Sequence, residues 1–157
     1  MHSMPTLDYE DKSNFYEDLR LAALGLVSGE TDLIANCANL AALLFHSLPD
    51  INWAGFYLLR DGELVVGPFQ GKPACVRIAL GEGVCGTAAS RRETLIVDNV
   101  ENFPGHIACD VDSRSEIVIP IFIGKELIGV LDIDAPIAAR FDEADRAGLE
   151  TLLTVLP

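Results

Sequence analysis

The spacing of apolar residues changes along this chain, and this change constrains the fold more than any other feature of the sequence. From Tyr9 to Val27, apolar residues recur every three or four positions, and a second stripe with the same spacing follows Thr31 and ends before Pro49. Both patterns predict amphipathic helices. Residues 142–156 repeat the helical pattern, with leucines on one face. We therefore expect two helices at the start of the domain and one at its end.

The middle of the chain predicts β-strands. Two pairs of apolar segments are joined by short turns, at Asp61-Gly62 and at Gly124-Lys125, which is typical of β-hairpins. Together with the helices, this pattern favours an α+β domain with about six mostly antiparallel strands. The expected strands are 53–59, 63–71, 74–80, 95–98, 116–123 and 126–134, with a short helix opening at the glycine-rich turn within 81–90 and a long loop over 99–115.

Length and charge limit the classes of function. The 157 residues suit one domain, which we place at residues 9–157, with residues 1–8 as an N-terminal extension or tag remnant. The net charge of −13 opposes binding to nucleic acids and to anionic lipid. No apolar run approaches the roughly 18 residues of a membrane span, and no secretory signal is evident, so we expect a cytoplasmic protein.

Three acidic residues are expected to converge on one end of the sheet. Asp132 and Asp134 alternate along a strand and therefore point to the same face. In-register pairing about the second turn gives paired residue numbers that sum to about 249, which puts Glu116 opposite residue 133 and beside both aspartates. Acids at a solvated strand end often serve only as edge protection. In a shared pocket, however, like charges raise a carboxyl pKa, and one protonated carboxyl then donates to an oxygen while ionised neighbours bind an ammonium group.

The four cysteines contain no CxxC pair. Cys37 lies on the apolar stripe of the second helix, where a buried, unreactive thiol is the expected role. Cys109 lies in the long polar loop, seven residues before Glu116, which favours a reactive thiol, although the adjacent Asp110 disfavours a thiolate. Cys75 and Cys85 flank a predicted strand and a glycine turn, and either is a candidate to resolve an oxidised Cys109.

The same residues allow two further hypotheses. A zinc site built from His106, Cys109 and two further cysteines matches no zinc-ribbon or zinc-finger spacing, and a protease-like Cys–His pair is weakly supported because His106 is a lone candidate. We therefore expect no metal site. Trp53, the only tryptophan, opens the first strand and is expected either in the core or as the wall of an apolar pocket.

Five segments resemble a known family: NWAGFYLL, GPFQGKPACVRIALGEGVCGTAA, PGHIACD, SRSEIVIPIF and GVLDIDAP. The sequence is similar to the free methionine-(R)-sulfoxide reductases, which are single-domain GAF proteins. The resemblance runs from about Tyr9 to Leu153, and the cysteines at 75, 85 and 109 match the family's trio in order and spacing. Cys37 is not part of that trio.

The resemblance implies a role for each matched residue. Cys109 matches the attacking cysteine, Cys75 the usual recycling cysteine and Cys85 the third cysteine. The matches to the substrate pocket are Trp53, Glu116, Asp132 and Asp134. The resemblance also implies reduction of free methionine sulfoxide without a metal or an organic cofactor, recycling by thioredoxin and a possible homodimer. The competing hypothesis is a GAF module that senses an oxidant or a small ligand without turnover, since a fold does not determine a function.

Overall fold

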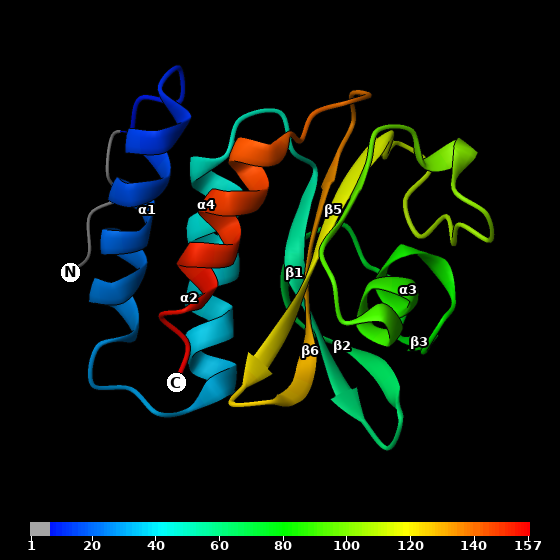
Figure 1. The fold of residues 1–157 in the computed structure, drawn as a ribbon, viewed down its shortest axis with the longest axis horizontal. Helices are drawn as coiled ribbons and strands as arrows, with labels where there is room; N and C mark the ends of the chain where they lie inside the picture. The colour runs from blue at the N-terminus through cyan, green and yellow to red at the C-terminus, as the bar shows by residue number, and fades with distance from the viewer. Residues whose placement is uncertain (1–6) are drawn as a thin grey trace.

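The computed structural model describes residues 7–157, so part of the predicted N-terminal extension, residues 1–6, lies outside the described residues. Three layers make up the domain (Figure 1): helices α1, α2 and α4 on one side, a six-stranded antiparallel sheet in the middle, and α3 with the longest loop on the other side. The helices are α1 (Lys12–Val27), α2 (Leu33–Ser47), α3 (Gly83–Arg91) and α4 (Glu143–Leu153). The strands are β1 (Trp53–Arg60), β2 (Glu63–Gly71), β3 (Arg77–Ala79), β4 (Leu95–Val97), β5 (Ser115–Ile123) and β6 (Glu126–Ala135), in the sheet order β3-β2-β1-β6-β5-β4.

The predicted fold class and both hairpins are confirmed, and several boundaries are corrected. Helix α1 begins at Lys12 rather than at Tyr9, because the Asp11 side chain accepts a hydrogen bond from the Asn14 amide and caps the helix there. Strand β3 is shorter than predicted, since Cys75 leaves the sheet and bonds to the long loop. That loop contains a 3₁₀ turn at Val100–Asn102, where the sequence predicted none, and α4 ends at Leu153 rather than continuing to residue 156.

The alternation of side chains on the central strands divides the interior into two parts. Odd-numbered residues of β5 and β6 and even-numbered residues of β1 pack against α1, α2 and α4 and form the larger apolar core. Even-numbered residues of β5 and β6 and odd-numbered residues of β1 face α3 and form a smaller core, which contains Trp53 and Tyr57. Any polar side chain on this second face is therefore directed into the space between the sheet and α3. None of the described helices is both long and apolar enough to cross a membrane.

Helix α3 packs tightly against the sheet edge through Gly86. A Cβ at this position would lie 2.2 Å from the carbonyl oxygen of Ala79, which is closer than any van der Waals contact allows. The Gly81 amide also donates to the Gly86 carbonyl at 2.8 Å, so the turn before the helix is fixed to its first turn. This packing places the neighbouring Cys85 on the buried side of α3.

Gly86→Ala is expected to lower the free energy of unfolding by about 1–3 kcal/mol, because the added methyl group must displace α3 from β3. Urea unfolding followed by circular dichroism measures this change. Gly25→Ala is the matched control: Gly25 lies in α1 with open space around its missing Cβ, so alanine should be neutral or stabilising there. Equal losses in both variants would contradict this account of the packing.

Candidate active site

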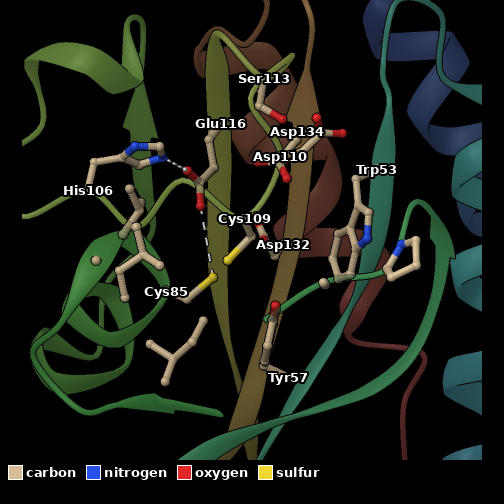
Figure 2. A pocket seen from close by; sticks show the side chains of 16 residues that line it. Trp53, Tyr57, Cys85, His106, Cys109, Asp110, Ser113, Glu116, Asp132 and Asp134 are labelled. Atoms are coloured by element: carbon tan, nitrogen blue, oxygen red, sulfur yellow. Dashed lines mark hydrogen bonds and ion pairs between the residues drawn. The ribbon is translucent and has the colours of Figure 1, made fainter. Parts of the chain in front are cut away.

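The pocket between the sheet and α3 collects side chains from distant parts of the sequence (Figure 2). Trp53 and Tyr57 come from β1, Glu116 from β5, and Asp132 and Asp134 from β6. All five lie on the strand face that is turned away from the three-helix layer, which is why strand alternation brings them together. Cys85 of α3 and the loop residues His106, Cys109, Asp110 and Ser113 complete the polar lining.

A β-bulge corrects the predicted pairing of the acids. Glu116 lies directly opposite Asp134, not opposite residue 133, because the register of β5 and β6 shifts by one residue between Ile121 and Phe122. Glu116 and Asp134 therefore form a cross-strand pair, and Asp132 follows two residues away on the same face. Trp53 pairs with Asp134 on the other side of β6. The bulge thus places three carboxyl groups and the indole side by side.

Two of the three acidic residues are buried rather than solvated. Glu116 and Asp132 are each only 6% exposed, which argues against the alternative that these acids only protect a solvated strand end. The Cys85 thiol donates to Glu116 Oε1 at 3.9 Å, and His106 Nε2 lies 3.9 Å from Glu116 Oε2. Asp132 Oδ1 is buried and has no hydrogen-bond partner in the structure. Because burial of an unpaired carboxylate is costly, the pocket is arranged for a positively charged or proton-donating ligand.

Burial shifts the proton affinity of the whole cluster. Desolvation raises the pKa of Glu116 and of Asp134 well above their usual values, and the charge of Asp132 adds to both shifts. Desolvation also raises the pKa of Asp132, to about 6. Contacts with Cys85 and Glu116 lower this pKa but only partly offset the effect of burial. The pKa of the Cys85 thiol is raised well above its usual value by burial and by the nearby carboxylates. The pKa of His106 is lowered by burial, which favours its neutral form. The raised pKa values of Glu116 and Asp134 therefore favour their protonated forms, whereas Asp132, with a pKa of about 6, is the carboxyl that ionises first.

Asp132→Asn is expected to stabilise the fold at pH 8 and to leave its stability nearly unchanged at pH 4. The folded pKa of Asp132 lies above that of the unfolded chain, so its contribution to stability is present at low pH and is lost as the pH rises through about 6. Asparagine has no such loss, and the melting temperature at pH 8 should rise on the order of 5 °C. Thermal unfolding of both proteins at the two pH values measures this, and an equal change at both would contradict it.

The structure contains one disulfide bond, between Cys75 and Cys109, with their Cα atoms 5.6 Å apart. Cys75 precedes β3, and Cys109 lies in the loop between the 3₁₀ turn and β5. Cys85, the other candidate partner, is a free thiol on the buried side of α3. Cys37 is also free and lies in α2 within the larger apolar core, as predicted. The zinc site considered from the sequence does not form in this state, because Cys109 is already bonded to Cys75.

Polar contacts hold the Cys109 loop over the pocket. Lys72 forms ion pairs with Asp112 at 2.6 Å and with Asp110 at 3.7 Å, on either side of residue 111. The Asn52 side-chain amide donates to Asp110 Oδ2 at 3.3 Å and to Ser113 Oγ at 3.2 Å. The loop is therefore attached to the segment that carries Cys75 and to the chain just before β1. These contacts hold the Cys109 loop close to the segment that contains Cys75.

Aromatic rings form one wall of the pocket. The Trp53 ring stacks on Phe69 with centroids 5.1 Å apart, and its indole N–H donates to the Lys72 carbonyl at 3.1 Å. The Tyr57 hydroxyl donates to the Cys75 carbonyl at 3.1 Å. The pocket therefore has aromatic rings beside its carboxyl groups on the same sheet face, which suits a ligand with both an apolar and a cationic part.

Sequence reasoning named Trp53, Cys85, Cys109 and the three acids, and the structure brings them into one pocket, with Cys75 on its rim through the disulfide. It missed Tyr57, although strand alternation from Trp53 would have placed Tyr57 on the same face. It also left His106 as an isolated candidate, whereas His106 lies beside Glu116. Asp110 and Ser113 line the pocket as well, and only the folded loop reveals this.

Comparison with known proteins identifies the architecture. A GAF domain family model matches residues 19–156. The sequence is 52% identical over 146 residues to the free methionine-R-sulfoxide reductase of Escherichia coli (strain K12), covering 93% of this chain and 88% of that protein.

Two solved structures resemble the fold closely. The free methionine-R-sulfoxide reductase of Neisseria meningitidis, solved in complex with its substrate, has a TM-score of 0.93 at 43% identity and covers 99% of this chain and 93% of its own. A putative GAF sensor protein from Burkholderia vietnamiensis has a TM-score of 0.89 at 60% identity, with 92% of each chain covered.

Proposed function

The chain belongs to the GAF-domain family of free methionine-R-sulfoxide reductases, and on that premise we propose that it reduces free L-methionine-(R)-sulfoxide through a sulfenic acid on Cys109 and a disulfide with Cys75. The observation that carries the proposal is the position of the Cys75–Cys109 disulfide at the pocket of buried carboxyls. A thiol that is oxidised and then resolved in each cycle must lie beside both its substrate and its partner thiol.

In the first step, the Cys109 thiolate attacks the sulfoxide sulfur while a carboxyl group donates a proton to the sulfoxide oxygen. Glu116 is the proposed donor, because its raised pKa keeps a proton available near neutral pH and its carboxyl lies deep in the pocket. The oxygen is transferred to Cys109, methionine leaves, and Cys109 becomes a sulfenic acid. The sulfoxide is reduced by two electrons and the thiol is oxidised by two.

In the second step, the Cys75 thiol condenses with the sulfenic acid, releasing water and forming the observed disulfide. The pocket in this state has a volume of only about 40 Å³, room for about three water molecules. The Cys109 loop must therefore move outward before an amino acid enters. The present structure corresponds in this scheme to the oxidised enzyme after the product has left.

Two aspartates account for a preference for the free amino acid. Asp132, which is buried, and Asp134 beside it offer carboxylates to the substrate ammonium group, whose charge favours their ionised forms and lowers their pKa values. A methionine sulfoxide residue within a peptide has no such ammonium group. Trp53 provides the wall for the methyl group on sulfur.

The direct experiment compares turnover of free L-methionine-(R)-sulfoxide, its S epimer and N-acetyl-methionine-(R)-sulfoxide in a thioredoxin-coupled assay. We expect turnover of the free R epimer and a large loss with either alternative. Equal rates with the N-acetyl compound would contradict recognition of the ammonium group. Absence of turnover with fully reduced thiols would favour a redox sensor that uses the same cysteine pair.

Cys75→Ser is expected to separate reduction from recycling. A reduced sample of the variant should form about one methionine per chain in the first turnover, because Cys109 is intact, and should then stop with thioredoxin as the reductant. Rapid-quench measurement of methionine resolves the two phases. Steady turnover of Cys75→Ser with thioredoxin at the parent rate would instead assign the resolving role to Cys85.

Thioredoxin is the proposed reductant, since a disulfide at the protein surface is reopened by exchange with a dithiol, and Cys109 is an exposed residue. We place the reaction in the cytoplasm, where thiols are kept reduced.

A homodimer is proposed as the working form. It is supported by exposed apolar residues on the first two helices, namely Leu21 and Leu24 on α1 and Ile34 on α2. Light scattering during size-exclusion chromatography measures this assembly state.

A further inference from the structure

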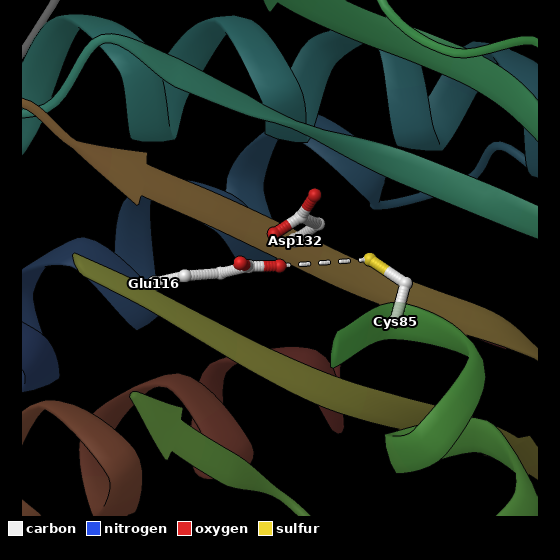
Figure 3. A group of neighbouring side chains, drawn as sticks. All are labelled: Cys85, Glu116 and Asp132. Carbon is white, nitrogen blue, oxygen red and sulfur yellow. Dashed lines mark hydrogen bonds between the residues drawn. The ribbon is translucent and has the colours of Figure 1, made fainter. Parts of the chain in front are cut away.

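Three possible metal ligands, one sulfur and two oxygen atoms, meet in the pocket, and none of them belongs to the two cysteines of the proposed cycle. The Cys85 sulfur, a Glu116 oxygen and an Asp132 oxygen all lie within 4.8 Å of one another (Figure 3). They come from α3, β5 and β6, and all three residues are buried. In the scheme above Cys85 neither attacks the substrate nor resolves the sulfenic acid, so the scheme leaves this thiol without a role.

The spacing of the Cys85 and Glu116 ligand atoms is near that found in zinc sites. Zinc binds thiolate sulfur at about 2.3 Å and carboxylate oxygen at about 2.0–2.2 Å, so that ligand atoms stand roughly 3.5 Å apart. The sulfur of Cys85 is 3.9 Å from Glu116 Oε1, so only a small side-chain rotation separates the pair from zinc geometry. The mixture of one sulfur and two oxygen ligands favours a borderline or soft divalent ion over magnesium or calcium.

A second observation points to a cationic ligand at the same place. Asp132 Oδ1 is buried and has no hydrogen-bond partner among residues 7–157, and Asp132 as a whole is 6% exposed. Within the described part of the chain, the ion pairs of Glu116 and Asp132 comprise only the contact of Glu116 with His106. The cavity volume of about 40 Å³ accommodates an ion with a water molecule, whereas an amino acid requires the loop to open.

We propose that Cys85, Glu116 and Asp132 form a binding site for one Zn²⁺ or similar thiophilic divalent ion, with water as the fourth ligand, and that this ion excludes the substrate. Binding displaces the thiol proton of Cys85 and any proton held by the two carboxyls, and no electron is transferred. Metal binding is independent of the reductase proposal. The inhibitory effect rests on the proposed function, because the ion takes both Asp132, which binds the substrate ammonium group, and Glu116, which donates the proton.

Cadmium titration of the oxidised protein tests the site directly. In this form Cys75 and Cys109 are joined, so only Cys85 and Cys37 remain as thiols. We expect one Cd²⁺ per chain, with the ultraviolet absorption band of cadmium thiolate. Cys85→Ser should remove the band, whereas Cys37→Ser should retain it, because Cys37 lies in the apolar core between the helices and the sheet. A band that survives in Cys85→Ser, or no band in the parent, would overturn the proposal.

The oxygen ligands are tested in the same titration. Asp132→Asn should weaken Cd²⁺ binding by about tenfold or more. Glu143→Gln, at an exposed position on α4, is the matched control and should bind as the parent does. Circular dichroism verifies that both variants fold. Equal affinities in the two variants would show that Asp132 is not a ligand and would contradict the site as stated.

Inhibition is measured with reduced protein from which the reductant has been removed. Zn²⁺ should suppress the single-turnover formation of methionine by about tenfold in the parent, and Cys85→Ser should lose most of this sensitivity relative to its own rate without zinc. Equal sensitivity would place the inhibitory ion elsewhere and overturn the competitive part of the proposal. If the parent forms no methionine even without zinc, the reductase proposal fails, and the cadmium titration alone decides the metal site.

Discussion

Cys109→Ser is expected to abolish reduction of methionine sulfoxide, with a fall in rate of about 10⁴-fold or more. A serine hydroxyl at this position is protonated at neutral pH and cannot form a sulfenic acid or a disulfide. Cys109 has no equivalent replacement in the pocket, because the remaining thiol there, Cys85, is buried against carboxyls that raise its pKa and disfavour its thiolate. Methionine formation in both single-turnover and coupled assays measures the loss.

Cys37→Ser is the control for this substitution. Cys37 is buried in α2, and burial raises the pKa of its thiol to about 12, so it takes no part in exchange. Its replacement should leave the rate unchanged. Residual turnover in Cys109→Ser above about one hundredth of the parent rate would mean that another thiol attacks the substrate, and the proposed mechanism would then be wrong.

Glu116→Gln should lower kcat/KM by about 10²–10³-fold, the second largest effect that we expect. Glutamine keeps the shape of the side chain but removes the carboxyl proton that is transferred to the sulfoxide oxygen. Since Glu116 is buried beside Cys85 and pairs across the strands with Asp134, no water replaces the lost carboxyl easily. Steady-state kinetics with the free R epimer measures the change.

The pH dependence of the reaction rate tests the same role of Glu116. In the parent, the protonated form of Glu116 is lost as the pH rises through its raised pKa, so the rate should fall on the alkaline side. Glu116→Gln should lack that alkaline fall. Glu143→Gln removes an exposed carboxyl on α4 and should retain the parent profile. An unchanged alkaline fall in Glu116→Gln would assign proton donation to another group.

Much of the fold and part of the site can be predicted from the pattern of apolar residues. The alternation in the two hairpins places Asp132 and Asp134 on one face, and the same alternation from Trp53 reaches the pocket wall. These predictions rest on strand geometry alone. Once one face of a strand is known to be buried, the two-residue period determines which face each side chain lies on. The helical stripe likewise identifies Cys37 as a core residue.

The remaining features depend on contacts between distant segments. The bulge at Ile121 and Phe122 shifts the register by one residue, and no turn residue indicates it. The burial of Glu116 requires α3 to pack above the sheet, and this position depends on the close approach of Gly86 to Ala79. The pairing of Cys75 with Cys109 depends on a loop whose path is held by Lys72 and Asn52. Local propensity contains no information on such contacts.

The most direct test of the central claim is a single turnover of reduced protein with free L-methionine-(R)-sulfoxide, followed by mass spectrometry of the cysteine peptides. The account predicts about one methionine per chain in the first step. The Cys75–Cys109 disulfide should then appear as the product of the second step. Oxidation of the cysteines without release of methionine would contradict it and would indicate a redox sensor.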